Sequence, residues 1–334
     1  MNILFSCAGR RRYLLKYFKE ALNDGDKIIA TDMQYSAPAL TEADIIEIVP
    51  AVYAENYIET LKNICISHNV NAIISLNDLE LPILAQNKSL FDEIGTKIIV
   101  SSSEVIDICF DKYKTFEFIN KIGLKSPKTY YNLYYAKSEL KNGALKFPVI
   151  IKPRWGSGSI GIEIANDIED LEILYNYIKK KLSKTILSSV SAVENSILIQ
   201  EYIDGQEYGL DIMNDLKGNL CGVSIKKKIS MRAGETDKAI TIENKIISSI
   251  GAKLSINLKH IANLDCDILE KDGEFYVLEL NPRFGGGYPF SHEAGVNMPK
   301  AIIDWLNNKK APEIYFRAET NKSFAKCDIL VKVK

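Results

Sequence analysis

The chain has 334 residues, of which 46% are hydrophobic and 25% are charged, values typical of a globular protein with two or three subdomains. Its 42 basic and 43 acidic side chains give a formal net charge of −1, which excludes the basic surplus of proteins that coat nucleic acid or anionic membranes. The cysteines are scattered, no apolar run approaches a membrane span, and the apolar start precedes the first charges. We therefore expect a cytoplasmic protein without a zinc cluster, disulfide framework, membrane helix or secretory signal.

The N-terminal part of the chain alternates between short apolar strands and helical periods. Strands are expected at residues 2–6, 28–32, 72–76 and 97–100, with helices from the first strand through residue 22 and at 57–68. This alternation predicts right-handed crossovers and a parallel, doubly wound sheet. Such sheets bind ligands at the carboxyl ends of their strands, which here carry Gly9, Arg10, Asp32 and Asp78.

The middle of the chain changes from alternating elements to paired strands. A helix is expected from Glu104 to about Gly123. Antiparallel pairs are then expected at 148–152 with 160–165, at 196–202 with 208–213, and at 264–270 with 274–280. Helices are expected at 167–182, with Asn166 and Glu169 placed for a capping box, and at 241–254. This pattern predicts an α+β domain after the α/β domain.

A Gly/Ser-rich segment at residues 156–161 matches G-x-G-x-x-G. A Rossmann turn must enter a helix, whereas residues 160–165 alternate like a strand. A Walker A motif also fails, because Ile162 follows the last glycine. Two alternatives remain: a β-hairpin whose tip lays N–H groups over phosphate oxygens with Lys152 beneath it, or a hairpin tip that binds no ligand.

Residues 264–283 form an acidic hairpin. Because side chains alternate along a strand, Val277, Glu279 and Asn281 should share one face. A two-residue Asp-Gly turn would place Asp267 on the other face. We predict instead a three-residue Lys-Asp-Gly turn with a left-handed glycine in a bulge, which places Asp267 opposite Val277 and beside Glu279. Two carboxylates and an amide oxygen suit Mg²⁺ bridging nucleotide phosphates, and the alternative is a solvent-facing acidic strand.

As a set, these motifs resemble the ATP-grasp superfamily, and most closely the branch similar to the carbamoyl-phosphate synthase large subunit. The resemblance covers nearly the whole chain. It implies a mixed α/β and α+β fold with an N-terminal Rossmann-like pre-ATP-grasp domain at residues 1–103 and a two-lobed ATP-grasp domain at 104–310. The small lobe would span about 125–200 and the large lobe about 200–310, with a C-terminal segment, 311–334, packed on the large lobe.

The resemblance also implies roles for individual residues, with ATP as the nucleotide and Mg²⁺ (or Mn²⁺) as the metal. Lys112 and Lys152 match the phosphate-binding lysines. The loop over the phosphates corresponds to Trp155, Gly156, Ser157, Gly158, Ser159 and Gly161. The adenine hinge corresponds to Gln200, Glu201, Tyr202 and Ile203, with Glu207 on the ribose. Asp267, Glu279 and Asn281 match the metal ligands, and Arg283 matches the arginine that faces the transferred phosphoryl group.

Substrate contacts are expected in three further places. The basic run 224–232 is usually a solvated face, but the family loop at this place faces the γ-phosphate, which implies catalytic roles for Arg232 and Lys228. Gly9 and Arg10 lie in a loop whose arginines either hold a carboxylate or phosphate or are solvated. Glycines in 284–292 allow the backbone to approach a ligand closely, which nominates Gly286 and Gly287.

The implied reaction is the attack of a substrate carboxylate on ATP, which gives an acylphosphate that an amine or another nucleophile then displaces. The partners would be a small-molecule carboxylate and an amine, and a homodimer fits the family. The chain has one ATP-grasp unit, where a carbamoyl-phosphate synthase large subunit has two, and it has no internal glutaminase. The rival functions are a small-molecule kinase, a nicotinamide oxidoreductase and a non-catalytic nucleotide sensor.

Overall fold

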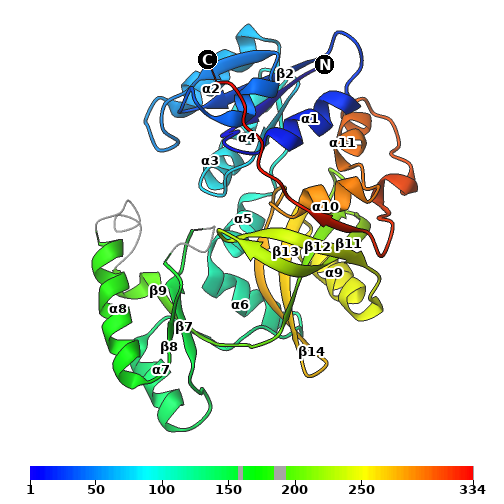
Figure 1. Ribbon diagram of the computed structural model, residues 1–334. Helices are drawn as coiled ribbons and strands as arrows, with labels where there is room; N and C mark the ends of the chain where they lie inside the picture. The colour runs from blue at the N-terminus through cyan, green and yellow to red at the C-terminus, as the bar shows by residue number, and fades with distance from the viewer. Residues whose placement is uncertain (157–160, 184–192, 334) are drawn as a thin grey trace.

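Three β-sheets organise the part of the chain that the structure describes, residues 1–156, 161–183 and 193–333 (Figure 1). The structure is a computed structural model. The N-terminal sheet is parallel, whereas the other two are built from antiparallel pairs. The predicted change from an α/β to an α+β organisation is therefore confirmed. No helix in the described ranges has the length and apolarity needed to cross a membrane.

The N-terminal sheet has five strands in the order β3-β2-β1-β4-β5. Its side chains alternate between two cores, so that Ile3 and Phe5 point to one face and Leu4 to the other. Helices cover both faces, as in a doubly wound fold. The bounds are β1 Asn2–Ser6, α1 Arg12–Ala21, β2 Lys27–Asp32, η1 Pro38–Glu42, β3 Ile45–Ile48, α2 Tyr57–Ser67, β4 Ala72–Ser75, α3 Leu81–Gln86, α4 Lys88–Asp92 and β5 Lys97–Ile98.

The single helix expected from Glu104 is two helices, α5 (Ser103–Phe110) and α6 (Lys112–Lys121). The break falls at Asp111, which adopts an extended backbone conformation and accepts hydrogen bonds from the N–H groups of Tyr113 and Lys114. An aspartate in this role caps the first turn of a helix. The prediction was wrong because the apolar period alone does not reveal an internal cap.

The small sheet has four strands in the order β6-β9-β7-β8. The predicted antiparallel pairing of β7 with β8 is confirmed. The N-cap of α8 is Asp167 rather than Asn166, because the Asp167 side chain accepts from the N–H groups of Glu169 and Asp170. The bounds are β6 Thr129–Tyr130, α7 Leu133–Lys141, β7 Val149–Pro153, β8 Glu163–Ala165, α8 Ile168–Leu182, η3 Val193–Ser196 and β9 Ile197–Glu201.

The large sheet has six strands in the order β14-β13-β10-β11-β12-β15. Two predictions were wrong here. Strands β9 and β10 do not pair, because they belong to different sheets, and Thr241 lies in a strand rather than starting a helix. That helix begins only after Asn244, whose side chain caps it. The bounds are β10 Gln206–Asn214, β11 Leu220–Arg232, β12 Glu235–Ile242, α9 Lys245–Leu258, β13 Ala262–Lys271, β14 Glu274–Asn281 and β15 Ser323–Ala325.

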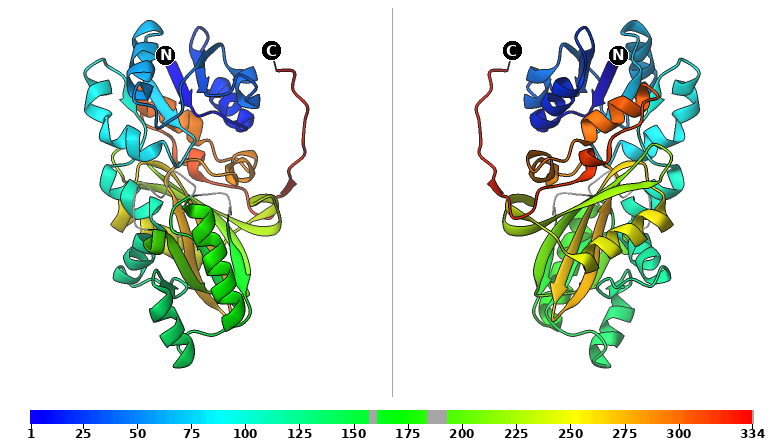
Figure 2. Two further views of the ribbon diagram at one scale, coloured as in Figure 1. Left: turned by 90° about the vertical axis from the view of Figure 1, so that its left-hand side faces the viewer. Right: turned by 90° about the vertical axis from the view of Figure 1, so that its right-hand side faces the viewer.

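The C-terminal part of the chain returns to the N-terminal sheet. Helix α11 (Met298–Leu306) contacts α1, and its Ile302 and Ile303 pack in the same core as Ile3 and Phe5. Helix α10 (Tyr288–Glu293) and the turn η4 (Glu313–Phe316) lie beside it. After β15 the chain runs back along the N-terminal domain (Figures 1 and 2). The C-terminal segment thus joins the large sheet through β15 and also reaches the N-terminal domain.

Candidate functional site

The acidic hairpin has a two-residue turn at Asp272 and Gly273, both with positive φ, because Lys271 pairs with Glu274. The predicted three-residue turn was therefore wrong, since an Asp-Gly pair adopts the left-handed conformations of a tight hairpin. A β-bulge between Asp267 and Ile268 shifts the pairing of the two strands by one residue. Ile268 pairs with Val277, whereas Asp267 pairs with Glu279. The insertion of one additional residue brings the two carboxylates opposite each other.

The bulge also changes which side chains share a face. Val277 and Leu280 are fully buried in the core between the large sheet and its helices. The expectation that Val277 lies on the face of Glu279 was therefore wrong. Glu279 and Asn281 lie on the other side of the strand and are partly exposed, as is Asp267. Helix α6 packs on the opposite, core side, where Ile119 shares the core of Val277 and Leu280.

Asp267 contacts an ammonium group rather than being free for a metal. Lys228 Nζ lies 2.7 Å from Asp267 and 2.6 Å from Glu207. Burial opposes the charge of Lys228, but the carboxylates of Asp267 and Glu207 outweigh it and raise its pKa. Burial raises the pKa of Asp267, and Lys228 acts in the opposite direction.

The donor set fits a hard divalent cation, because it consists of two carboxylates on paired positions and the amide oxygen of Asn281. Within residues 1–156, 161–183 and 193–333, no group of three His, Cys, Asp or Glu side chains is preassembled around a metal position. Lys228 compensates the charge of Asp267 in this arrangement. A metal ion bound here would share that carboxylate with Lys228 or replace the ammonium.

A small cavity brings together residues from distant parts of the sequence: Lys112, Gly156, Glu279 and Asn281 all line it. The ammonium group of Lys112 donates a hydrogen bond to the carbonyl oxygen of Gly156. Lys152 is buried outside the lining of this cavity, and burial and the charge of Lys112 lower its pKa to about 8, while Glu279 acts in the opposite direction. Lys112 and two candidate metal ligands therefore line one cleft.

Gln200 and Asp111 position these two lysines. Gln200 is buried, accepts a hydrogen bond from Lys152 at 2.7 Å, and donates to Thr129 at 2.8 Å. Asp111, immediately before Lys112, accepts two hydrogen bonds of 2.7 Å from Arg154. The bidentate geometry holds the start of α6 against the end of β7. The side chain of Gln200 was expected to contact the adenine, but it forms hydrogen bonds with Lys152 and Thr129 inside the protein.

Arg283 joins the N-terminal domain to the large sheet. Its guanidinium lies 2.9 Å from Asp78 and 3.0 Å from Asp265. Burial opposes the charge of Arg283, but these two carboxylates raise its pKa. Gly285 is needed beside them, because a Cβ there would lie 2.1 Å from Asp265 Cγ. Asp78, which the sequence placed at the ligand-binding edge of the N-terminal sheet, and Asp265, which it did not single out for a role, therefore set the position of Arg283.

The expected adenine hinge connects the small sheet to the large sheet, since β9 ends at Glu201 and β10 begins at Gln206. Within this connection Ile203 is buried and Tyr202 is partly exposed. Gly205 passes close to the neighbouring hairpin, because a Cβ there would lie 2.4 Å from the carbonyl oxygen of Glu270. The segment between α6 and β6 is the second link from the small sheet to the rest of the chain.

The remaining predicted residues lie in different surroundings. The Trp155 ring is stacked near Arg154, with 5.0 Å from the guanidinium carbon to the ring centroid. Gly161 has a positive φ and packs near Pro153. Arg232 is not brought to the Lys112 cleft, because it pairs with Asp237 and Asp328 at the end of the β11–β12 hairpin. Ser157, Gly158 and Ser159 lie outside the described residues.

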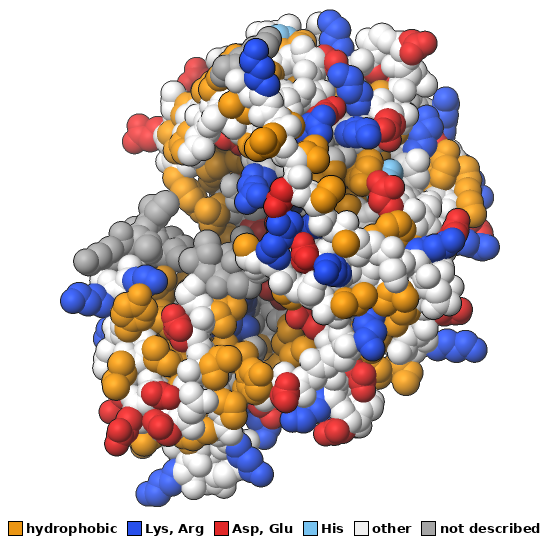
Figure 3. Space-filling model, in the orientation of Figure 1, with side chains coloured by type: hydrophobic (Ala, Val, Ile, Leu, Met, Phe, Trp, Pro, Cys, Tyr) orange, Lys and Arg blue, Asp and Glu red, His pale blue; other side chains and the backbone are white. Residues whose placement is uncertain are grey.

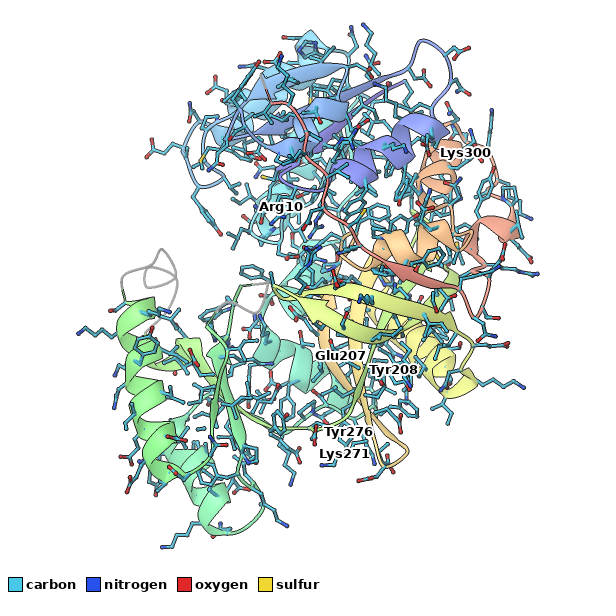
Figure 4. All side chains as sticks on the ribbon, in the orientation of Figure 1. Arg10, Glu207, Tyr208, Lys271, Tyr276 and Lys300 are labelled. Atoms are coloured by element: carbon cyan, nitrogen blue, oxygen red, sulfur yellow. The ribbon has the colours of Figure 1, made fainter. Side chains whose placement is uncertain are left out.

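The predicted substrate residues border two further cavities. Gly286 and Gly287 line a cavity of about 50 Å³ with Lys228 and Asp267. Arg10 lines a larger cavity on the other side of the β11–β12 hairpin. Gly9, with a positive φ, donates its N–H to Asp32 at 2.8 Å. Figure 4 shows Arg10 at the edge of the N-terminal domain and Glu207 on the large sheet.

A buried polar network beside Lys228 was missed. Lys226 and Asp211 are both buried and form an ion pair, and Ser291 donates to Asp211 at 2.5 Å. Asn263 also donates to Asp211, at 3.0 Å. The signal was the i, i+2 spacing of Lys226 and Lys228, which places both side chains on one face of β11. The sequence alone does not reveal that β10, which carries Asp211, pairs with β11, which carries Lys226.

Comparison with known families adds to this geometry. Residues 145–289, which contain Lys152, Glu279 and Asn281, match the ATP-grasp domain family. The chain contains an ATP-grasp domain. Residues 3–99 match the PylC-like N-terminal domain family. The ATP-grasp match includes the small sheet from β7 onward and the acidic hairpin, and therefore the Gly156, Glu279 and Asn281 side of the cleft.

Curated relatives of this ATP-grasp chain include carbamoyl phosphate synthases. The large chain of Thermoanaerobacter sp. (strain X514) is 26% identical over 237 residues, covering 67% of this chain and 21% of the relative. The carbamoyl-phosphate synthase of Methanobrevibacter smithii is 26% identical over 318 residues, covering 92% of this chain and 81% of the relative. The chain thus spans about a fifth of the length of the large chains that it matches.

Solved structures share the fold of this ATP-grasp chain. The L-amino acid ligase of Bacillus licheniformis is 18% identical with a TM-score of 0.74, covering 98% of this chain and 81% of that one. The biotin carboxylase domain dimer of Hydrogenobacter thermophilus 2-oxoglutarate carboxylase, in complex with MgADP, is 17% identical with a TM-score of 0.74. It covers 96% of this chain and 73% of that one. At these identities the likeness establishes the fold.

Proposed function

We propose that the protein is an ATP-dependent carboxylate–amine ligase. The observation that carries this proposal is the cleft that Lys112 lines with Glu279 and Asn281, inside a chain with an ATP-grasp domain, with Lys152 buried within the electrostatic influence of Lys112 and Glu279. Two cations opposite a set of oxygen donors match the needs of a nucleotide triphosphate with its metal ion. Relatives that make carbamoyl phosphate and a structural neighbour that is an L-amino acid ligase support the same reaction class.

In the proposed reaction, a carboxylate oxygen of the substrate forms a bond to the γ-phosphorus of ATP, and ADP leaves with the electrons of the broken P–O bond. The amine then attacks the carbonyl carbon of the acylphosphate, loses a proton, and phosphate leaves. No side-chain nucleophile is required, because the carboxylate is already anionic. The protein contributes position and charge.

The proposed roles follow from position. Lys112 and Lys152 would contact the phosphates, and Arg283, held by Asp78 and Asp265, would face the transferred group. Asp267, Glu279 and Asn281 would hold Mg²⁺, which neutralises charge on the phosphates when it is bound; Mn²⁺ has the same preference for oxygen ligands. The biotin carboxylase neighbour in complex with MgADP supports this metal and nucleotide.

The connection between the sheets is the proposed adenine site. The backbone of Glu201, Tyr202 and Ile203 would take the base, and Glu207 the ribose. The loop that begins at Trp155 would cover the phosphates and exclude water, which would otherwise hydrolyse the acylphosphate. A homodimer is the proposed assembly, supported by the dimeric neighbour, and light scattering after size exclusion tests it.

The test is ADP and phosphate release from Mg-ATP, with the purified protein screened against pooled carboxylates and amines. Glu279→Gln removes a proposed metal ligand, and we expect a loss of turnover of at least about 100-fold. Asp272→Asn is the matched control, because this exposed carboxylate lies at the turn of the same hairpin. Release that needs both a carboxylate and an amine supports a ligase.

Other results would reject the proposal. ADP release with one acceptor and a stable phosphorylated product would identify a kinase. ATP binding without turnover on every pool would identify a nucleotide sensor. Equal turnover of Glu279→Gln and Asp272→Asn would remove the acidic hairpin from the catalytic site.

A further inference from the structure

A cavity of about 640 Å³ lies where the N-terminal domain, the β11–β12 hairpin, α10 and the C-terminal segment meet. We call it the hairpin cavity, lined by Arg10, Arg11, Glu235, Phe290, Glu293 and Lys326 among others. Thr236 lines both the hairpin cavity and the smaller cavity beside Lys228 and Asp267. A ligand in the hairpin cavity would therefore lie next to the proposed reaction centre.

As many acidic as basic side chains line the hairpin cavity, and most of them neutralise one another. Arg232 pairs with Asp237 and Asp328, and Lys326 pairs with Glu235 at 3.0 Å. Basic and acidic side chains are interspersed on the surface where the hairpin meets the N-terminal domain (Figure 3). These pairs form the walls and leave little net charge to attract an ion of either sign.

Three charges lining the cavity have no ion-pair partner among the residues that the structure describes: Arg10, Arg11 and Glu293. Arg10 is exposed, and Arg11 donates only to the carbonyl oxygen of Phe284. Glu293 is exposed and accepts a hydrogen bond from Tyr17 at 2.7 Å. The cavity therefore has two positive groups on the N-terminal domain and one negative group on α10 that no ion pair neutralises among the described residues.

The arginine side is also electropositive through its backbone. Arg11 is the N-cap residue of α1, has no side-chain cap hydrogen bond, and is followed by no acidic residue in the first turn. The positive end of the dipole of such a helix attracts anions. Burial raises the pKa of Glu235, but the positive charges of Lys326, Arg11 and Arg10 outweigh burial and lower it. Both arginines therefore act on the interior of the cavity.

Aromatic side chains provide an apolar wall. Tyr13, Phe290 and Phe324 line the hairpin cavity. Tyr17, which holds Glu293, is itself stacked on His292 with 3.6 Å between ring centroids. The volume is in the range of sites that enclose a small organic molecule. A ligand with a carboxylate, an ammonium group and an apolar part would find a matching group for each.

We propose that the hairpin cavity binds a free amino acid as a zwitterion, with its carboxylate at Arg10 and Arg11 and its ammonium at Glu293. The apolar side chain would pack against Phe290 and Tyr13. The inference rests on the proposed function only for its consequence, that this amino acid is one of the two substrates joined by the ligase. The binding itself requires neither ATP nor a metal ion.

The first test is calorimetric titration of the full chain with individual free amino acids in the absence of nucleotide. For the amino acid that binds best, the N-acetyl derivative lacks the ammonium group and the carboxamide lacks the carboxylate. Each should bind at least about tenfold more weakly, because a charge-assisted hydrogen bond is lost. Equal binding of the N-acetyl derivative would overturn the assignment of Glu293.

Variants locate the site. Arg10→Gln and Glu293→Gln should each weaken binding by roughly tenfold or more. Lys16→Gln is the matched control, since Lys16 is an exposed cation on α1 that does not line the cavity. Both Arg10 and Glu293 are exposed, so these variants should fold. Weakening in the control as well would place the ligand elsewhere.

Cys327 supplies an independent readout, because this exposed thiol lines the hairpin cavity. The bound amino acid should slow its alkylation by iodoacetamide, followed by peptide mass spectrometry, and should not change the rate at Cys221. Burial raises the pKa of Cys221 to about 11, so its slow reaction serves as an internal reference. No binding and no protection with any amino acid would overturn the proposal, whereas protection without ATP turnover would leave it standing and reject the ligase function.

Discussion

The ammonium nitrogen of Lys228 lies 2.7 Å from the carboxylate of Asp267. The same ammonium contacts Glu207 at 2.6 Å. A single cation thus links the carboxylate proposed for the metal to the carboxylate proposed for the ribose. Binding of a metal ion or nucleotide must change the charge balance of this trio.

Lys228→Gln should lower the free energy of unfolding by about 2 kcal/mol, because two partly buried carboxylates lose their shared cation. Mg²⁺ should restore part of that loss by neutralising Asp267. Urea denaturation with and without Mg²⁺ measures both effects. Lys227→Gln is the control, since Lys227 is the exposed neighbour on the opposite face of β11. Equal destabilisation by the two variants would contradict the prediction.

The stability contribution of Lys152 should depend on pH. Burial and Lys112 lower its pKa to about 8 in the folded chain, while the unfolded value stays near its ordinary 10.5. Between these values the unfolded state binds more protons, so stability rises with pH. Relative to Lys152→Met, the wild-type protein should therefore gain free energy of unfolding from pH 8 to pH 10.

Lys146→Met serves as the comparison for Lys152, because Lys146 is an exposed lysine before the same strand. Its difference from wild type should stay flat over the same pH range. A flat difference for Lys152→Met as well would mean that the ammonium is not desolvated. Chemical denaturation at several pH values settles the point.

Asp111 has two separable roles, and two variants distinguish them. Asp111→Asn keeps an N-cap for α6 but loses the ion pair with Arg154, whereas Asp111→Ala loses both. We expect Asp111→Ala to be less stable than Asp111→Asn by about 1 kcal/mol, the value of a cap. Thermal and urea denaturation provide the comparison. Both variants should raise the KM for ATP, because Lys112 follows directly.

Gly285→Ala should destabilise the protein by about 2 kcal/mol, because the added Cβ would overlap Asp265 and disturb its pair with Arg283. Gly287→Ala is the matched variant on the same loop, where the nearest side-chain atom would lie 3.6 Å from the new Cβ. Its stability should change by less than about 0.5 kcal/mol. Equal melting temperatures for the two variants would refute the steric argument.

The N-terminal sheet was predictable from local pattern. Its strands are short apolar runs, as expected where both faces are covered, and Ile3, Leu4 and Phe5 alternate between the two cores. The boundaries that failed depend on single polar residues. Asp111, Asp167 and Asn244 each cap a helix, and their effect is invisible to an apolar period.

Pairing across sheets was less predictable. Strands β9 and β10 are adjacent in sequence but belong to different sheets, and no local feature of residues 202–205 reports that the chain changes sheet. The hairpin was predicted with the wrong turn. Asp267 nevertheless lies beside Glu279, because a bulge shifts the register. The pairs Lys226–Asp211 and Arg283–Asp78 join residues far apart in sequence and follow from tertiary packing alone.

The core shared by the two ends of the chain limits how this protein can be divided. One hydrophobic core contains residues from both ends of the chain: Ile3, Phe5 and Leu14 pack there together with Ile302, Ile303 and Phe316. A fragment ending near residue 103 would expose its part of that core to water and aggregate. Exchanging the N-terminal unit with that of a relative would likewise require α11 and η4 to move with it. The unit that can be transplanted between such proteins is therefore discontinuous in sequence.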